Sequence, residues 1–178
     1  MNIRPYKTSL PRIDNTAYID EAACIIGDVN IGADVSFWPM AVARGDVNSI
    51  TIGAGTNVQD GAVLHVTCDS QFVPGGKPLL IGENVTIGHS AVLHACTIEE
   101  FCLIGMNATV LDGAIIHSRC MVAAGSVVSP GKVLESGFLY VGAPAKQARP
   151  LKQVELDYLE FSAQHYIELK NDYLGKNY

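Results

Sequence analysis

Residues 81–128 read IGENVTIGHSAVLHACTIEEFCLIGMNATVLDGAIIHSRCMVAAGSVV, and an aliphatic residue returns there at almost every sixth position. The same spacing begins much earlier in the chain and is interrupted by a short insertion after Ala43 and a longer one after Leu64. The residue directly after each aliphatic residue is often Gly. The residue four positions after the aliphatic residue is nearly always small. The full series has eighteen hexads, which begin at Ile13, Ile19, Ile25, Ile31, Phe37, Ala43, Ile52, Val58, Leu64, Ile81, Ile87, Leu93, Ile98, Ile104, Val110, Ile116, Val122 and Val128.

A period of six matches neither an α-helix nor the two-residue alternation of a half-buried strand. It predicts a mainly β fold, a parallel β-helix in which each hexad forms one flat side and three hexads close one triangular coil. The aliphatic residue points inward, and stacking of the coils buries what no single hexad can bury. Eighteen hexads therefore predict about six coils over residues 13–134, stacked about 4.7–4.9 Å apart.

The two ends of the chain lack this period. We expect residues 1–12 to lead into the prism, and the hexads to stop after Val128, because residues 142–145 read Gly-Ala-Pro-Ala, a loop signal. Residues 135–178 are then a connecting loop and a C-terminal amphipathic helix, and the whole chain is one domain. The apolar stripe of that helix is expected to pack on the prism or on a neighbouring subunit, and consists of Leu151, Val154, Tyr158, Phe161, His165 and Leu169.

Composition narrows the class of protein. The 178 residues are 48% hydrophobic and 17% charged with a net charge of −6, which is typical of a globular domain. The sequence has no cluster of basic residues that would bind the phosphate backbone of a nucleic acid. It also has no apolar run long enough to span a bilayer. The N-terminus has no apolar signal segment, and the five cysteines include no C-x-x-C pair. We therefore expect a cytoplasmic protein with no nucleic-acid or membrane partner.

The hexad positions predict that several polar residues lie above one another on the faces of the prism. Arg44, His65 and His94 each follow the aliphatic residue of a third side in successive coils, so they form one column. His65 and His94 are stacked neighbours, close enough to share a metal ion. His89 follows Ile87 by two residues on a second side, in the same column as Asp60. A residue there can join the other two histidines only when another copy of the protein docks against this face.

The alternative interpretation is that these are ordinary surface histidines, which a single histidine of this kind more often is. Two of the three in one column favour the metal site instead. His117 and His165 are expected to be ordinary surface or packing residues, and Cys102 and Cys120 to fill space at small positions.

At these residues the chain resembles a known family. Five segments are similar to the signature of the gamma-class carbonic anhydrases and their bacterial hexapeptide-repeat relatives: Arg44-Gly45-Asp46, Gln59-Asp60, His65, Gly88-His89 and Leu93-His94. The resemblance covers nearly the whole chain. It implies a left-handed β-helix and a homotrimer with three interfacial metal sites, His65 and His94 coming from one subunit and His89 from the next.

The resemblance also implies roles for single residues. Arg44, Asp46 and Asp60 would form ion pairs at the interface, Gln59 would orient the metal-bound water, and Tyr140 would line the pocket. The implied activity is reversible hydration of carbon dioxide to bicarbonate by metal-bound hydroxide. The implied cofactor is Zn²⁺, with Fe²⁺ or another divalent transition metal as the open alternative.

One departure lowers the expected rate. The founding archaeal enzyme of the family has a Glu after the Arg-Gly-Asp aspartate and further glutamates in a loop, one of which exports protons. Here the first position is Val47, and the loop 67–78 contains no Glu. Two other functions therefore stay open: a hexapeptide-repeat acyltransferase that uses coenzyme A, and a non-catalytic metal-binding trimer that serves as a scaffold or assembly subunit.

Overall fold

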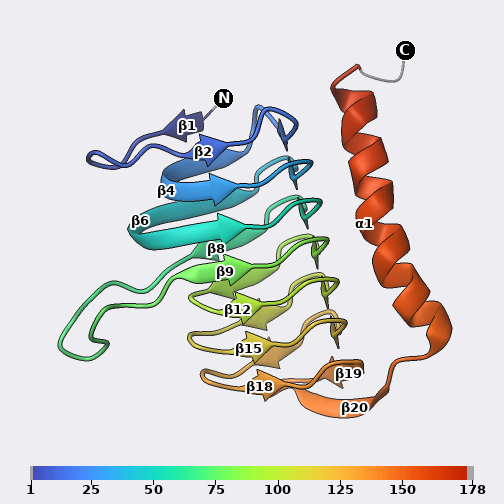
Figure 1. Ribbon diagram of the computed structural model, residues 1–178. Helices are drawn as coiled ribbons and strands as arrows, with labels where there is room; N and C mark the ends of the chain where they lie inside the picture. The colour runs from blue at the N-terminus through green and yellow to red at the C-terminus, as the bar shows by residue number, and fades with distance from the viewer. Residues whose placement is uncertain (1, 176–178) are drawn as a thin grey trace.

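The computed structural model describes residues 2–175, which form a parallel β-solenoid with one long helix along its side (Figure 1). The strands are mostly two or three residues long, and they stack into three faces. The third face is the column of β1 (Asn2–Arg4), β4 (Cys24–Ile31), β6 (Val42–Ile52), β8 (Val63–His65), β11 (Val92–His94), β14 (Thr109–Val110) and β17 (Val127–Val128).

The other two faces repeat the same arrangement. The first face contains β2 (Arg12–Ile13), the second halves of β4 and β6, β9 (Leu79–Ile81), β12 (Thr97–Ile98), β15 (Ile115–Ile116) and β18 (Val133–Leu134). The second face contains β3 (Tyr18–Ile19), β5 (Ser36–Phe37), β7 (Asn57–Val58), β10 (Thr86–Ile87), β13 (Leu103–Ile104), β16 (Met121–Val122), β19 (Phe138–Val141) and the antiparallel β20 (Lys146–Pro150). The long strands β4 and β6 cross a corner, which is why the first and third faces share one sheet.

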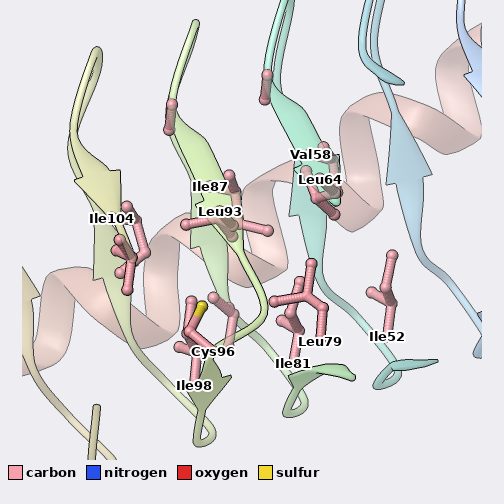
Figure 2. Packing of buried hydrophobic residues seen from close by; sticks show 14 of the residues in the cluster. Ile52, Val58, Leu64, Leu79, Ile81, Ile87, Leu93, Cys96, Ile98 and Ile104 are labelled. Atoms are coloured by element: carbon pink, nitrogen blue, oxygen red, sulfur yellow. The ribbon is translucent and has the colours of Figure 1, made fainter. Parts of the chain in front are cut away.

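The hexad prediction is confirmed by the strand pairing. Each aliphatic residue that opens a hexad pairs with the one three hexads later, as Leu64 does with Leu93 and Ile87 with Ile104. From Ile25 to Val128 these residues are all buried, and Figure 2 shows several of them stacked inside the prism. Cys102 and Cys120 fill small buried positions, as predicted, and burial raises the pKa of the Cys120 thiol to about 11.

The prism is longer than the sequence predicts. Ile3 pairs with Ile25 at the N-terminal end, so part of the expected lead-in belongs to the sheet. At the other end, Leu134 pairs with Ile116 and Tyr140 with Val122. Within residues 2–175 each face is therefore seven layers deep instead of six. The expected connecting loop is a strand, β19, because its backbone still finds partners in β16, and the chain turns away only at residues 142–145.

The helix α1 (Gln153–Tyr173) returns along the second face, where it contacts β3, β5, β7 and β10 (Figure 1). Its predicted apolar stripe does not pack closely on the prism of its own chain, because Val154, Tyr158 and Phe161 are 50–68% exposed. Packing of this stripe on a neighbouring subunit stays a prediction. The buried positions are Leu159, Ser162, Ala163 and Lys170.

Polar contacts explain this choice of face. The Ser162 hydroxyl is 2.8 Å from the Thr86 hydroxyl on β10. The fully buried Lys170 ammonium donates to the Thr16 carbonyl at 2.9 Å and to Asp34 at 2.6 Å. Among residues 2–175, no helix combines the length and hydropathy that crossing a membrane requires.

Candidate metal centre

His65 and His94 end the neighbouring strands β8 and β11 on the third face, where they are direct partners in the ladder. The Nδ1 atom of His65 lies 3.1 Å from the Nε2 atom of His94. The two side chains are 19% and 33% exposed, so they lie at the surface of the prism with one side open. The predicted histidine column is therefore present in the structure.

Each of these rings is held by a carboxylate at its other nitrogen. Asp46 Oδ1 is 3.0 Å from His65 Nε2, and Asp112 Oδ1 is 2.6 Å from His94 Nδ1. Asp46 comes from the layer before His65 and Asp112 from the layer after His94. The column therefore reads carboxylate, imidazole, imidazole, carboxylate. Histidines that bind metal usually donate their second N–H to such a carboxylate, which fixes the tautomer and the orientation of the ring.

Both aspartates are well stabilised as anions. Partial burial raises the pKa of Asp46, but the hydrogen bonds from Arg44 and His65 outweigh burial and hold this pKa below its usual value. The Arg44 guanidinium lies 2.5 Å from Asp46. Burial likewise opposes ionisation of Asp112, and hydrogen bonds from the Thr67 hydroxyl and His94 lower its pKa overall. Two anionic ends favour a cation between the rings.

The geometry of the pair fits a divalent transition metal. When the outer nitrogens donate to Asp46 and Asp112, two neutral rings turn their lone pairs toward each other across 3.1 Å. Two nitrogen ligands of tetrahedral Zn²⁺ lie about 3.3–3.4 Å apart, given Zn–N distances of about 2.0–2.1 Å. Among residues 2–175, no three His, Cys, Asp or Glu side chains of one chain are grouped to hold a metal. One chain thus contributes two imidazoles to such a centre.

His89 lies on the second face, in the turn after β10. Its Nδ1 atom is 2.9 Å from Asp60 Oδ2, so the predicted column of Asp60 and His89 is also present. The two side chains are about half exposed. The hexad positions predict that His89 lies apart from the His65–His94 pair of the same chain, and the structure agrees with this prediction.

Gln59 is buried next to Asp60, and its amide donates to Asn57 at 3.1 Å, which restricts the amide plane. A groove of about 190 Å³ opens between β10, β13 and α1, and Gln59 and His89 both line it. The helix contributes Tyr158, Ser162 and Tyr166 to the same groove. Tyr158 belongs to the predicted apolar stripe, whereas Ser162 and Tyr166 were not predicted, because the helix period alone does not indicate which face meets the sheet.

Tyr140 lies elsewhere, and its expected position in the pocket is not supported. It is 2% exposed in the seventh layer of the second face, and its hydroxyl accepts a hydrogen bond from the Glu135 backbone N–H at 2.7 Å. Tyr140 is an inward hexad residue that closes the end of the core.

The two remaining histidines have ordinary roles in this chain. His117 on the first face is 3.0 Å from Glu99, one layer away. His165 is exposed on the outer side of α1, where its ring stacks on Phe161.

Comparisons with known proteins identify the family of the chain. The family described as bacterial transferase hexapeptide (six repeats) matches residues 95–130. Protein YrdA of Escherichia coli is 49% identical over 98% of this chain and 95% of its own length. The mitochondrial gamma carbonic anhydrase 2 of Arabidopsis thaliana is 44% identical over 94% of this chain, which spans 60% of that protein.

A solved structure shares both the fold and much of the sequence. The hexapeptide transferase family protein from Anaplasma phagocytophilum superposes with a TM-score of 0.88 and 43% identity, over 96% of this chain and 97% of that one. The parallel solenoid, the repeats and these relatives together show that the chain belongs to the hexapeptide-repeat family, whose members include the gamma carbonic anhydrases.

Proposed function

We propose that this chain is a gamma-carbonic-anhydrase-like metalloprotein that interconverts carbon dioxide and bicarbonate, with Zn²⁺ or another divalent transition metal held between the subunits of a homotrimer. The observation that supports this most directly is the His65–His94 pair with its two carboxylate partners. A second support is the 44% identity with a gamma carbonic anhydrase over nearly the whole chain.

In this proposal the residues have separate tasks. His65 and His94 of one subunit and His89 of its neighbour bind the ion, which supplies Lewis acidity and lowers the pKa of water bound to it to about 7. Asp46 and Asp112 hold two of the rings in the tautomer that leaves a lone pair for the ion. The restricted amide of Gln59, close to His89, suits the role of orienting a water molecule.

Arg44 and Asp60 have the charges that a subunit interface would join. Arg44 is 45% exposed and Asp60 is 50% exposed in the single chain. When the third face of one subunit meets the edge of the next subunit's second face, where Asp60 and His89 lie, Arg44 approaches Asp60. The ion pairs of the interface and the metal site would then form together.

The test measures metal content and carbon dioxide hydration in the same preparations. We expect the native protein to bind about one metal per chain and to hydrate carbon dioxide in a stopped-flow assay. His65→Ala and His89→Ala should each lose the metal while keeping the solenoid, because neither side chain belongs to the core. His117→Ala is the matched control, since this histidine also pairs with a carboxylate one layer away, and it should keep the metal.

Co-expression of the two defective variants tests the sharing of the site. A cyclic trimer with random composition rebuilds a complete site wherever an intact His65 of one chain meets an intact His89 of the next, so roughly a quarter of the native metal content should return. A full metal complement in a stable monomer contradicts the shared site. Metal-replete protein that is inactive at every buffer concentration contradicts the carbonic anhydrase activity and favours the scaffold or, if acyl-CoA is consumed, the acyltransferase.

A further inference from the structure

We propose that Asp112, fixed by Thr67, is a positioning residue for His94, and that this contact connects the loop 67–78 to the metal centre. The inference rests on the proposed function, because it concerns the same centre. It adds two residues to which neither the repeat nor the resemblance assigns a role.

Both oxygens of the Asp112 carboxylate have a partner. Oδ1 is 2.6 Å from His94 Nδ1, and Oδ2 accepts a hydrogen bond from the Thr67 hydroxyl. A carboxylate held at both oxygens cannot rotate away from the ring. His94 therefore keeps its proton on Nδ1 and turns the lone pair of Nε2 toward His65, where a metal ion would bind.

The segment between β8 and β9 projects from the prism as a loop (Figure 1), and Thr67 is near the start of this segment. Its backbone exchanges two hydrogen bonds of 3.0 Å with Lys77, which closes the loop. The Asn48 side chain donates to the Thr67 carbonyl at 3.3 Å. One residue thus joins the closed base of the loop to the carboxylate that holds His94, so a change in the loop can reach the ligand through a single hydroxyl.

The chain contains its own matched control for this contact. Glu99 and His117 form the same kind of pair, carboxylate oxygen to Nδ1 at 3.0 Å between adjacent layers, on the first face. The exposure of the two pairs is similar, at 36% and 39% against 33% for both members of the His94–Asp112 pair. His117 has no role in the proposed centre, so loss of Glu99 removes the same interaction without touching the metal.

The first measurement is the Zn²⁺ affinity of the assembled protein, by competition with a chromophoric chelator. We expect Asp112→Ala to weaken binding by about 10–100-fold, the usual effect of removing the carboxylate behind a histidine ligand. Asp112→Asn should retain most of the affinity, because its amide oxygen still accepts from Nδ1. Thr67→Val should fall between these two, and Glu99→Ala should bind Zn²⁺ like the native protein.

The second measurement needs no metal. Long-range ¹H–¹⁵N correlation NMR of the metal-free assembly reports the tautomer of His94 directly. We expect Nδ1–H in the native protein and in Asp112→Asn, and loss of that preference in Asp112→Ala. An unchanged tautomer together with an unchanged Zn²⁺ affinity in Asp112→Ala overturns the inference, as does an equal loss of affinity in Glu99→Ala.

The two measurements separate this inference from the proposed function. If the native protein binds no metal but the tautomer still depends on Asp112, the proposed function fails and the positioning role stands. If metal binds and neither readout depends on Asp112 or Thr67, the positioning role fails and the function stands. Should Asp112→Ala fail to fold, Thr67→Val decides the outcome, because it removes the hydroxyl that holds Asp112 Oδ2. A Zn²⁺ affinity and a His94 tautomer that are both unchanged in Thr67→Val then overturn the inference.

Discussion

At the scale of single residues, the solenoid converts a distance along the chain into a fixed neighbour in space. His65 and His94 are separated by 29 positions, yet their ring nitrogens lie 3.1 Å apart, because one complete coil and its loop lie between them. The spacing of strands in a ladder then sets the spacing of imidazoles. Asp46 enters the same column from the part of β6 that crosses a corner of the prism, and Asp112 enters it from the turn after β14.

Val47 occupies the position at which the resemblance implies a glutamate in the archaeal prototype. Its side chain is 43% exposed beside Asp46, so a carboxylate placed there would be in contact with water. We expect carbon dioxide hydration by the native protein to be slow in weak buffer and to rise with imidazole concentration. Val47→Glu should recover part of the rate in weak buffer, since a positioned acid–base group is worth about 10²–10⁴-fold.

Leu80→Glu is the control for this substitution, because Leu80 has nearly the same exposure on the first face, at 42%. Stopped-flow rates at several buffer concentrations compare the three proteins. If Val47→Glu is no faster than Leu80→Glu in weak buffer while fully loaded with metal, proton export is not what limits the reaction.

At the scale of elements, the short strands contribute little individually and depend on the layers above and below. Ile104 on β13 is fully buried between Ile87 and Val122, its partners in the ladder. Two residues later, Met106 is 56% exposed. The inward residue and not the strand as such therefore determines how strongly each layer is held.

Truncation on β13 measures this difference. Ile104→Ala should lower the free energy of unfolding by about 2–5 kcal/mol through lost burial and the cavity left behind. Met106→Ala, in the same layer, should change it by less than about 0.5 kcal/mol. Denaturant titration followed by circular dichroism gives both values, and equal losses would contradict the assignment of Ile104 to the core.

The start of helix α1 depends on an acidic side chain. Glu155 accepts hydrogen bonds of 2.7 Å from both Nη atoms of Arg149 and one of 2.8 Å from the Lys152 backbone N–H. These contacts, the Arg149 hydrogen bond first, lower the pKa of Glu155 to about 2 from 4.5. A lowered carboxyl pKa stabilises the folded state above pH 4.5, and this stabilisation disappears as the pH falls through about 2.

Glu155→Gln should therefore lower the Tm at neutral pH, and the difference from the native protein should shrink between pH 4.5 and 2. Glu168→Gln on the same helix is the control, since Glu168 only accepts from Gln164 one turn away. Thermal melts at a series of pH values test this. A difference in Tm that is constant down to pH 2 would show that the charge of Glu155 is not the cause.

At the scale of the whole molecule, the three faces have different surroundings. Helix α1 covers the second face, the histidine pair lies on the third, and His89 lies in a turn at the edge of the second. In the proposed trimer, the third face of each subunit meets that edge of its neighbour. Arg44 and Asp60 then move from partly exposed positions into an interface, where loss of one charge partner costs about 3–5 kcal/mol.

Arg44→Ala should for this reason weaken the assembly more than it alters a single prism. Sedimentation at micromolar concentration should show dissociation of the variant under conditions in which the native protein remains assembled. Arg119→Ala is the control, because Arg119 has similar exposure and, like Arg44, pairs with a carboxylate of its own chain, but lies outside the column of His65 and His94. If Arg44→Ala remains assembled at high dilution, Arg44 does not form an ion pair at the interface and is an ordinary solvated surface charge.

What the sequence determined by itself is everything that follows from the period of six. That period specifies both the phase and the layer of each residue, so it predicts the inward residues, the neighbouring positions of His65 and His94, and the column of Asp60 and His89. Leu134 and Tyr140 continue this spacing of six. The loop signal at residues 142–145 led to the prediction that the hexads stop after Val128.

Only the tertiary structure decided the contacts of the segments that do not follow the six-residue repeat. Asp112 lies in the turn after β14, and Thr67 lies at the closed base of the loop 67–78. Neither residue lies in a strand, so the period of six does not predict that Asp112 contacts His94 or that Thr67 contacts Asp112. The helix has two plausible faces, and its apolar stripe points outward because Ser162 and Lys170 find hydrogen-bond partners on the prism. A repeat specifies positions within its own lattice, whereas contacts between the lattice and irregular segments depend on which polar groups can be satisfied once both are folded.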